Sequence, residues 1–176
     1  MFIRTLPFLL AIATSLAINT AHAATDGSLN FRGQVNAGTC NLAAGDVNRT
    51  DTLPTDKIPD FDSAVYTGAH EFEVSADCES DIKNVSFLFT GSSSPGNAPA
   101  LFTNTGTSGG TALWLAHRAP ALNTIPANGT PTQRTRTVAT SNKKATLPLT
   151  AAYHKTGAAV TQGTLVSAVT VSITYN

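Results

Sequence analysis

Three carboxylates surround one of the cysteines in this sequence. Asp77 and Glu79 flank Cys78, and Asp81 follows two residues later. On an extended strand, side chains two residues apart project to the same side, so Asp77 and Glu79 would form one acidic edge. Paired carboxylates can hydrolyse a glycosidic bond that lies between them. Solvated carboxylates at a strand end give the same pattern, so an enzyme on a β-sandwich that acts through these three residues is one hypothesis among others.

The cysteines and histidines lack the spacing of a catalytic or metal site. Neither Cys40 nor Cys78 has a local signature of a reactive thiol, although a catalytic cysteine is the alternative to a disulfide. Three histidines share this lack of ligand spacing: His70, His117 and His154. There is no nucleophile elbow, and the Gly-rich run 106–110 lacks the Lys-Ser/Thr end of a phosphate loop. We therefore predict no catalytic residue, no metal site and no cofactor.

The N-terminus has the three parts of a secretory signal peptide. Arg4 provides the positive start, residues 6–18 form an apolar run, and Ala21-His22-Ala23 is a small-x-small cleavage site. The apolar run is shorter than the roughly 20 residues that span a bilayer. Residues 1–23 are therefore predicted to be a signal peptide, with a buried N-terminal helix as the alternative. Export to an oxidising compartment makes a Cys40–Cys78 disulfide the default expectation.

The charge of the chain excludes one class of partner. Removing Arg4 from eleven Lys and Arg leaves ten, against eleven Asp and Glu, so the chain after residue 23 has a formal charge of −1. This balance lacks the positive footprint needed to attract nucleic acid or an anionic membrane, and no nucleic-acid partner is predicted. Charged residues make up 12% of the chain, while Thr, Ala, Ser and Gly are abundant. Such a composition is typical of β proteins with hydroxyl-covered outer faces.

Short segments with period-two alternation indicate the strands that position the carboxylates, cysteines and histidines described above. Five of them place apolar residues on one face: 29–35, 72–76, 85–89, 145–153 and 169–175. Residues 112–116, with Trp114 at their centre, form a continuous apolar run that suits a strand covered on both faces. Residues 135–138 are a further candidate strand, and 91–97 and 104–111 are predicted loops. Several short strands with Gly and Pro punctuation predict an all-β sandwich.

The C-terminal part of the sequence has a pattern of its own. From Val169 to Tyr175, apolar residues occupy the odd positions and Thr or Ser the even ones. Gly163 opens the last fourteen residues, and Tyr175 is penultimate. A Pro-containing strand with Ala-x-Tyr, followed by Thr-Gly, spans residues 147–157. In these features the sequence resembles the type 1 fimbrial pilins of the bacterial chaperone–usher pathway.

Further segments extend the resemblance over essentially all of the chain after residue 23. They are Phe31-x-Gly33-x-Val35 before Cys40, Phe72-x-Val74 before Cys78, and Phe87-x-Phe89-Thr90-Gly91. The family implies an incomplete immunoglobulin-like β-sandwich that lacks its final strand and is completed by a donor strand from another subunit. The resemblance therefore divides the chain into a signal peptide (1–23), a donor-strand extension (24–36) and a pilin domain (37–176).

On this resemblance, the donor strand presents Leu29, Phe31, Gly33 and Val35 along one face. The alternative is that residues 29–35 are the first strand of a complete sandwich in the same chain. Pro148 cannot donate to a strand ladder, so it is expected at a sheet edge or a bulge, beside the groove left by the missing strand. The residues expected to form the groove and contact the chaperone are Leu147, Leu149, Ala151, Tyr153, Val169, Val171, Ile173 and Tyr175.

The resemblance implies a structural subunit of a chaperone–usher fimbria that polymerises by donor-strand exchange and supports cell adhesion. Its expected location is an extracellular fimbrium, reached through the periplasm. The implied partners are neighbouring pilin subunits, a periplasmic chaperone, an outer-membrane usher and a host-surface receptor. The alternatives are a minor tip or adaptor subunit, or an adhesin with its own receptor-binding site.

Overall fold

The computed structural model of the chain describes residues 29–176, and the predicted signal peptide, 1–23, lies outside them. The chain divides into two units, with the boundary after Val35. Residues 29–35 belong to no helix or strand, and the side chains of Leu29, Phe31 and Val35 are exposed. The strands of the described part all lie in residues 36–176, so residues 29–35 are not the first strand of this chain's own sandwich.

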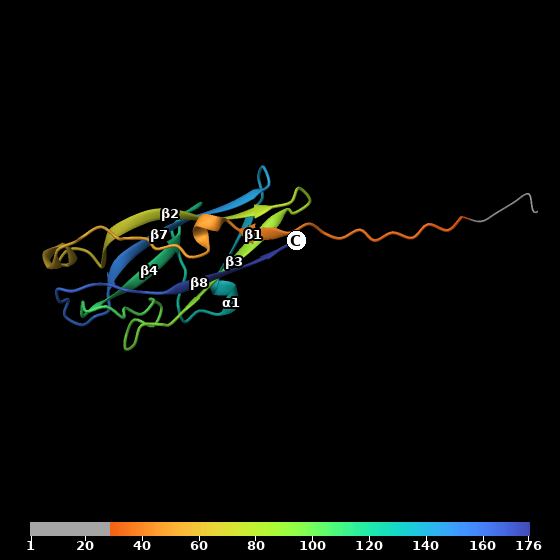
Figure 1. The fold of residues 1–176 in the computed structure, drawn as a ribbon. Helices are drawn as coiled ribbons and strands as arrows, with labels where there is room; N and C mark the ends of the chain where they lie inside the picture. Colours follow the sequence, from red (N-terminus) through yellow and green to blue (C-terminus); the bar gives the residue numbers. More distant parts are fainter. Residues whose placement is uncertain (1–28) are drawn as a thin grey trace, which may run out of the picture. The chain divides into compact units, whose positions relative to one another are not determined.

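Residues 36–176 form two antiparallel sheets (Figure 1). The larger sheet has the order β1 (Cys40–Leu42), β2 (Tyr66–Cys78), β7 (Lys144–Lys155), β4 (Thr111–His117) and β5 (Asn123–Thr124). The smaller sheet has the order β6 (Thr135–Ala139), β3 (Asn84–Gly91) and β8 (Val169–Tyr175). The helical turns are η1 (Ala44–Asp46), η2 (Ile58–Phe61) and α1 (Pro131–Arg134). The predicted all-β immunoglobulin-like sandwich is confirmed.

The core lies between the inward faces of the two sheets. Its largest fully buried side chains are Phe87, Phe102, Ile125, Leu147, Leu149 and Val85. Burying a Phe or Leu side chain of this size stabilises the fold by about 1.5–3 kcal/mol. The alternation predicted for 85–89 corresponds to β3, in which every second residue is buried, and that for 145–153 to β7, in which Ala145, Leu147, Leu149 and Ala151 belong to the core.

A disulfide ties the edge strand β1 to β2. Cys40 and Cys78 lie directly opposite each other in the register of the two strands, and their sulfurs are bonded, as the sequence predicts. Strand β1 has only three residues, too few to show alternation, which is why the sequence pattern does not reveal it. Its attachment therefore depends on the disulfide in addition to a short ladder.

Strand β2 begins earlier than its sequence pattern suggests. The register with β7 shifts between Thr67 and His70, where Gly68 adopts a φ of +62°. A bulge of this kind interrupts period-two alternation, so the pattern is regular only from Phe72 onward.

The expected edge position of Pro148 is wrong. Pro148 lies in β7, an inner strand paired with β2 on one side and β4 on the other. Its carbonyl accepts the N–H of Arg118, one residue beyond the end of β4. The missing N–H would point the same way, toward the Arg118 carbonyl. The proline is tolerated there because the neighbouring strand has ended, which a local pattern cannot indicate.

Within residues 29–176, the structure contains no helix long and apolar enough to cross a membrane.

Candidate functional site

Strand β8 presents an unpaired edge. It pairs with β3 on one side, and no strand of residues 29–176 pairs with its other side. Its side chains alternate as the sequence predicts: Val169, Val171 and Ile173 are half-buried and pack against the core, while the Thr and Ser residues between them are exposed. An edge of this kind carries free backbone N–H and C=O groups and can accept a further strand.

Opposite this edge, residues 43–53 form an irregular segment that we call the strap. It follows β1, contains η1, and lies along the edge of β2 without forming a strand. The Ala43 N–H donates to the Ser75 carbonyl at 2.9 Å, and the Ser75 N–H donates to Asp46 Oδ2 at 2.8 Å. Side-chain and loop contacts therefore satisfy the edge of β2 where β1 has ended.

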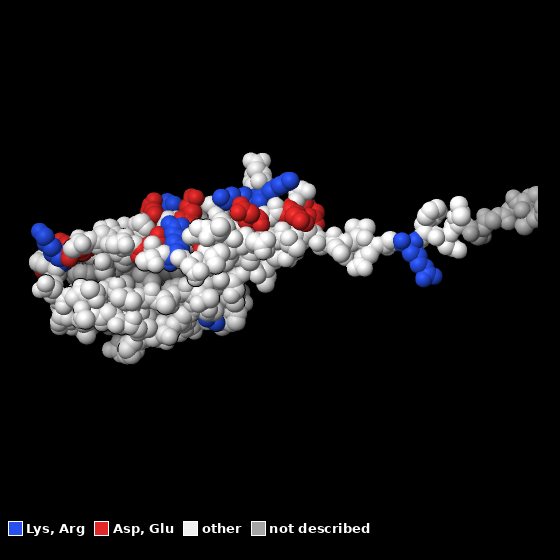
Figure 2. Space-filling model, viewed as in Figure 1, with Lys and Arg blue, Asp and Glu red and all other residues white. Residues whose placement is uncertain are grey.

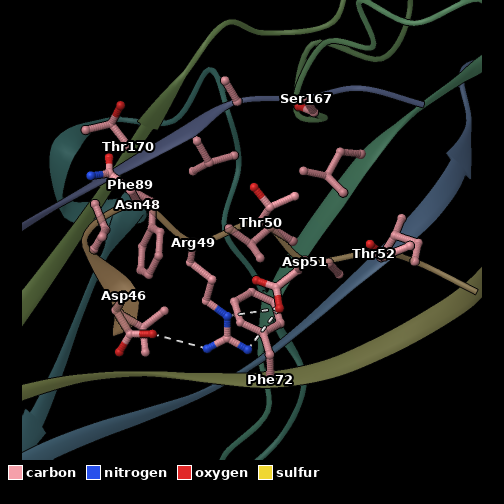
Figure 3. Close-up of a pocket in the computed structure, with 18 of the residues that line it drawn as sticks. Asp46, Asn48, Arg49, Thr50, Asp51, Thr52, Phe72, Phe89, Ser167 and Thr170 are labelled. Atoms are coloured by element: carbon pink, nitrogen blue, oxygen red, sulfur yellow. Dashed lines mark hydrogen bonds and ion pairs between the residues drawn. The ribbon is translucent and has the colours of Figure 1, made fainter. Parts of the chain in front are cut away.

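Arg49 holds the strap together (Figure 3). Its guanidinium lies 3.1 Å from Asp46 Oδ1 and 2.9 Å from Asp51 Oδ1, and it donates to the Glu73 carbonyl at 2.6 Å. It also lies 5.2 Å from the centre of the Phe72 ring, within reach of a cation–π contact. Burial acts to lower the pKa of Arg49, but the hydrogen bonds and charges of the two aspartates outweigh it and raise the pKa.

A groove of about 820 Å³ lies between the strap and residues 165–171. Strands of both sheets supply its apolar floor: Phe72, Val74, Phe89, Leu113 and Leu115. The strap and Ser167 add polar groups to its lining, and the buried Ser167 hydroxyl has no hydrogen-bond partner within the described residues. An apolar floor beside an unpaired strand edge can bury alternate side chains of an extended segment while the backbone pairs with β8.

The charges of the sandwich are distributed unevenly over the surface. Figure 2 shows Lys, Arg, Asp and Glu gathered over β1 and β2, whereas the surface over β8 and the loops beside it is almost uncharged in this view. Burial, followed by the negative charge of Asp56, raises the pKa of Tyr153 in the groove, so its phenol stays protonated. The floor of the groove thus offers an occupant apolar surface and no strong charge.

Four of the eight residues expected at the groove line it: Ala151, Tyr153, Val169 and Val171. Leu147 and Leu149 are instead fully buried in the core. Ile173 packs against the core beyond the groove, and Tyr175 lines a smaller depression of about 210 Å³ with the C-terminal Asn176. Contact of any of these residues with a chaperone stays a prediction.

Neither the strap nor the floor residues from β2, β3 and β4 have a sequence pattern that assigns them to a groove. Alternation did identify Phe72, Val74 and Phe89 as inward-facing residues of strands. The strap is polar and irregular, so no period in its sequence marks it as a wall. Assigning these residues requires knowing which edges the two sheets leave unpaired.

The carboxylates considered as catalytic residues have other contacts. Asp81 accepts the N–H of Gly38, and Glu79 accepts the N–H of Thr39. Asp77 belongs to β2, opposite Asn41. Within residues 29–176, no group of three or more His, Cys, Asp or Glu side chains is placed to hold a metal ion.

Comparison with known proteins shows the family to which the chain belongs. The sequence profile described as fimbrial protein matches residues 29–176. The chain belongs to the fimbrial protein family. A search of curated proteins finds no match.

Solved structures share the fold of this fimbrial chain. The P pilus rod subunit PapA is 17% identical with a TM-score of 0.61, and the match covers 78% of this chain and 99% of PapA. A subunit from a chaperone–usher pilus studied for rod uncoiling is also 17% identical, with a TM-score of 0.60 and coverage of 88% and 98%. The CupB6 tip adhesin of Pseudomonas aeruginosa is 20% identical with a TM-score of 0.50, over 64% of this chain and 32% of the adhesin.

Proposed function

We propose that this chain is a structural fimbrial subunit that polymerises by inserting residues 29–35 into the groove of the next subunit. The observation that carries the proposal is the groove beside an unpaired strand edge in a chain whose own segment 29–35 belongs to no strand. The strand that completes each sandwich would thus come from a second copy. The fibre would be an extracellular fimbrium that supports adhesion, as its family membership suggests.

The size and pattern of the segment suit the edge that would receive it. Residues 29–35 and strand β8 each comprise seven residues, an extended length of roughly 23 Å. In an extended segment, Leu29, Phe31, Gly33 and Val35 face one side, toward the groove floor. Burial of the Leu, Phe and Val side chains would contribute about 1.5–3 kcal/mol each, in addition to the backbone hydrogen bonds along β8.

An unoccupied groove exposes an apolar floor and a free strand edge, both of which favour aggregation. A subunit with these features needs a temporary occupant before it meets its neighbour. A periplasmic chaperone that contacts β8 and the groove would fill this role, and an outer-membrane usher would then pass the subunit to the growing fibre.

Two variants of the chain from residue 24, compared with the unsubstituted chain of the same length, test the proposal. Phe31→Asp places a charge on the inserting face, and Val171→Asp places one in the groove. Each variant alone is expected to remain monomeric, because one cannot donate and the other cannot accept. An equimolar mixture is expected to form a dimer, since the Val171 variant still donates and the Phe31 variant still accepts. Native mass spectrometry would measure both results.

Matched controls place the same charge on the opposite faces. Asn30→Asp lies on the outward face of the segment, and Ser172→Asp lies on the exposed face of β8. Both should polymerise as the wild type does, and near-ultraviolet circular dichroism would show that each variant is folded. Polymerisation of either Phe31→Asp or Val171→Asp alone, or no dimer on mixing, would count against strand insertion.

A second candidate function is receptor binding by the subunit itself. The likeness to a tip adhesin and an aromatic pair on the larger sheet favour it. The rings of Tyr66 and Trp114 stack with centroids 4.8 Å apart, and Tyr66 is partly exposed. Binding of wild-type subunit to a glycan array, lost in Tyr66→Ala, would support this function, and absence of binding would leave the structural role alone.

A further inference from the structure

We infer that Glu79 and Asp81 form a carboxylate clasp that fixes where the N-terminal segment leaves the sandwich. The clasp makes them positioning residues for strand donation. The inference rests on the proposed function, because it concerns the segment that would be inserted into a neighbour. It assigns a role to two of the three carboxylates that surround Cys78.

The clasp holds the backbone immediately before β1. The Gly38 N–H donates to Asp81 Oδ2 at 2.8 Å, and the Thr39 N–H donates to Glu79 Oε2 at 3.2 Å. The Glu79 N–H donates in turn to the Thr39 carbonyl at 2.9 Å. Since β1 begins only at Cys40, the carboxylates take the place of a strand partner for residues 38 and 39. Hydrogen bonds to an ionised carboxylate are stronger than those between neutral groups.

The residue type at position 38 fits the clasp closely. Gly38 is buried, and a Cβ atom there would collide with Asp81 Oδ1 and Glu79 Oε2. Only glycine lets the backbone approach both carboxylates without displacing them. The adjacent Cys40–Cys78 disulfide holds the two strands from which these residues extend. The bond to Asp81, the bond to Glu79 and the disulfide therefore hold residues 38, 39 and 40 in turn.

The turn that carries the clasp is also bonded to the end of β8. The turn that carries Glu79 and Asp81 continues to Lys83, whose N–H donates to the Asn176 carbonyl at 2.9 Å. Asn176 directly follows β8 and donates its own N–H to the Asn84 carbonyl at 3.3 Å. The point at which a subunit donates is thereby held at the C-terminal end of the strand on which it accepts. Such an arrangement would limit the range of angles between successive subunits.

The donor and acceptor variants described above separate this role from general stability. The double substitution Glu79→Ala/Asp81→Ala is introduced once into the donor-only chain (Val171→Asp) and once into the acceptor-only chain (Phe31→Asp). In the donor, dimer formation should slow roughly tenfold, because residues 38 and 39 become mobile and must be ordered again at insertion. In the acceptor, the rate should not change. Asp77→Asn in the donor is the matched control and should have no effect.

A second measurement tests the clasp directly in the Phe31→Asp chain from residue 24. The amide hydrogens of Gly38 and Thr39 should exchange at least about tenfold faster after the double substitution, since each loses a hydrogen bond to a charged group. Unchanged exchange, unchanged donation, or equal slowing in donor and acceptor would each overturn the inference. If the donor-only and acceptor-only chains that keep Glu79 and Asp81 fail to dimerise, the proposed function is refuted instead. The two failures are therefore distinguishable.

Discussion

One lateral side of the sandwich is closed and the other is open. On one side, Arg136 of β6 spans the gap between the sheets, and its guanidinium donates to Asn123 Oδ1 at 3.0 Å and the Thr124 carbonyl at 2.8 Å on β5. On the other side, β1 and β8 border the groove, and the strap arginine, Arg49, bonds to its own strap and to β2. An arginine thus links the two sheets on one side, whereas the arginine on the other side bonds to its own segment and to β2.

The partners of the two arginines explain the difference. Arg136 bonds to neutral oxygen atoms, including the carbonyls of Gln133 and Thr135, and burial lowers its pKa. Arg49 has two aspartates within its own strap, and their charges raise its pKa against the effect of burial. The Arg49 guanidinium is paired with carboxylates of its own segment, so its N–H groups are not directed across the gap between the sheets. On the open side, the arginine is thus held by ion pairs within the strap and by a carbonyl of β2.

The largest expected effect comes from removing the disulfide at the open side. The Cys40→Ala/Cys78→Ala double variant frees a loop with a sequence separation of 38 residues. The free energy of unfolding should fall by about 4 kcal/mol, on the chain-entropy account of disulfides. Urea denaturation would measure the loss, and the wild type in reducing agent should show a similar one. A loss below about 1 kcal/mol in both would mean that β1 is held by its ladder alone.

Opening the closed side should have the next largest effect. Arg136→Met keeps an apolar stem but removes the hydrogen bonds to β5, and should lower the free energy of unfolding by about 2–3 kcal/mol. The control is Arg134→Met, two residues earlier, whose buried Nε has no hydrogen-bond partner among the described residues. If both variants lose the same stability by urea denaturation, Arg136 does not close this side.

Loosening the strap should lower the free energy of unfolding by a smaller amount. Arg49→Met removes bonds between partly exposed groups and is expected to lower the free energy of unfolding by about 1–2 kcal/mol. Because the strap is a wall of the groove, insertion of a neighbour's segment should also weaken. Arg118→Met, which breaks a single ion pair with the exposed Glu71 away from the strap, is the control and should change neither quantity measurably. Equal effects of the two variants in denaturation and dimer assays would contradict a specific role for the strap.

The smallest expected effect is a pH dependence confined to the closed side. Burial, followed by the positive charge of Arg136, lowers the pKa of His117 from its ordinary value of about 6.5. Below that pH the unfolded chain binds a proton that the folded chain resists, so stability falls as the pH drops from about 6.5. His117→Gln should flatten this part of the stability profile between pH 7 and 5. An unchanged slope would assign the acid sensitivity to other groups.

The strand-level prediction succeeded where one residue in two faces the core over several residues. β3, β7 and β8 have this pattern, and their inward faces follow from the sequence alone. β1 and β5 are too short for any period to show, and the bulge near Gly68 hides the beginning of β2. Pro148 shows the limit of a local rule, because its tolerance depends on where the neighbouring strand β4 ends.

The sequence by itself determined the all-β class, the disulfide pair and the apolar face of β8, because each follows from residue type and a period of two. Only the tertiary structure decided which edges stay unpaired, that the strap forms a wall of the groove, and that Leu147 and Leu149 belong to the core. Contacts between distant residues set these features, as when Gly38 meets Asp81 across a separation of 43 residues. A local pattern carries no information about such pairs, since neither the carboxylates near Cys78 nor the glycine before Cys40 indicates in its own segment which residue it contacts.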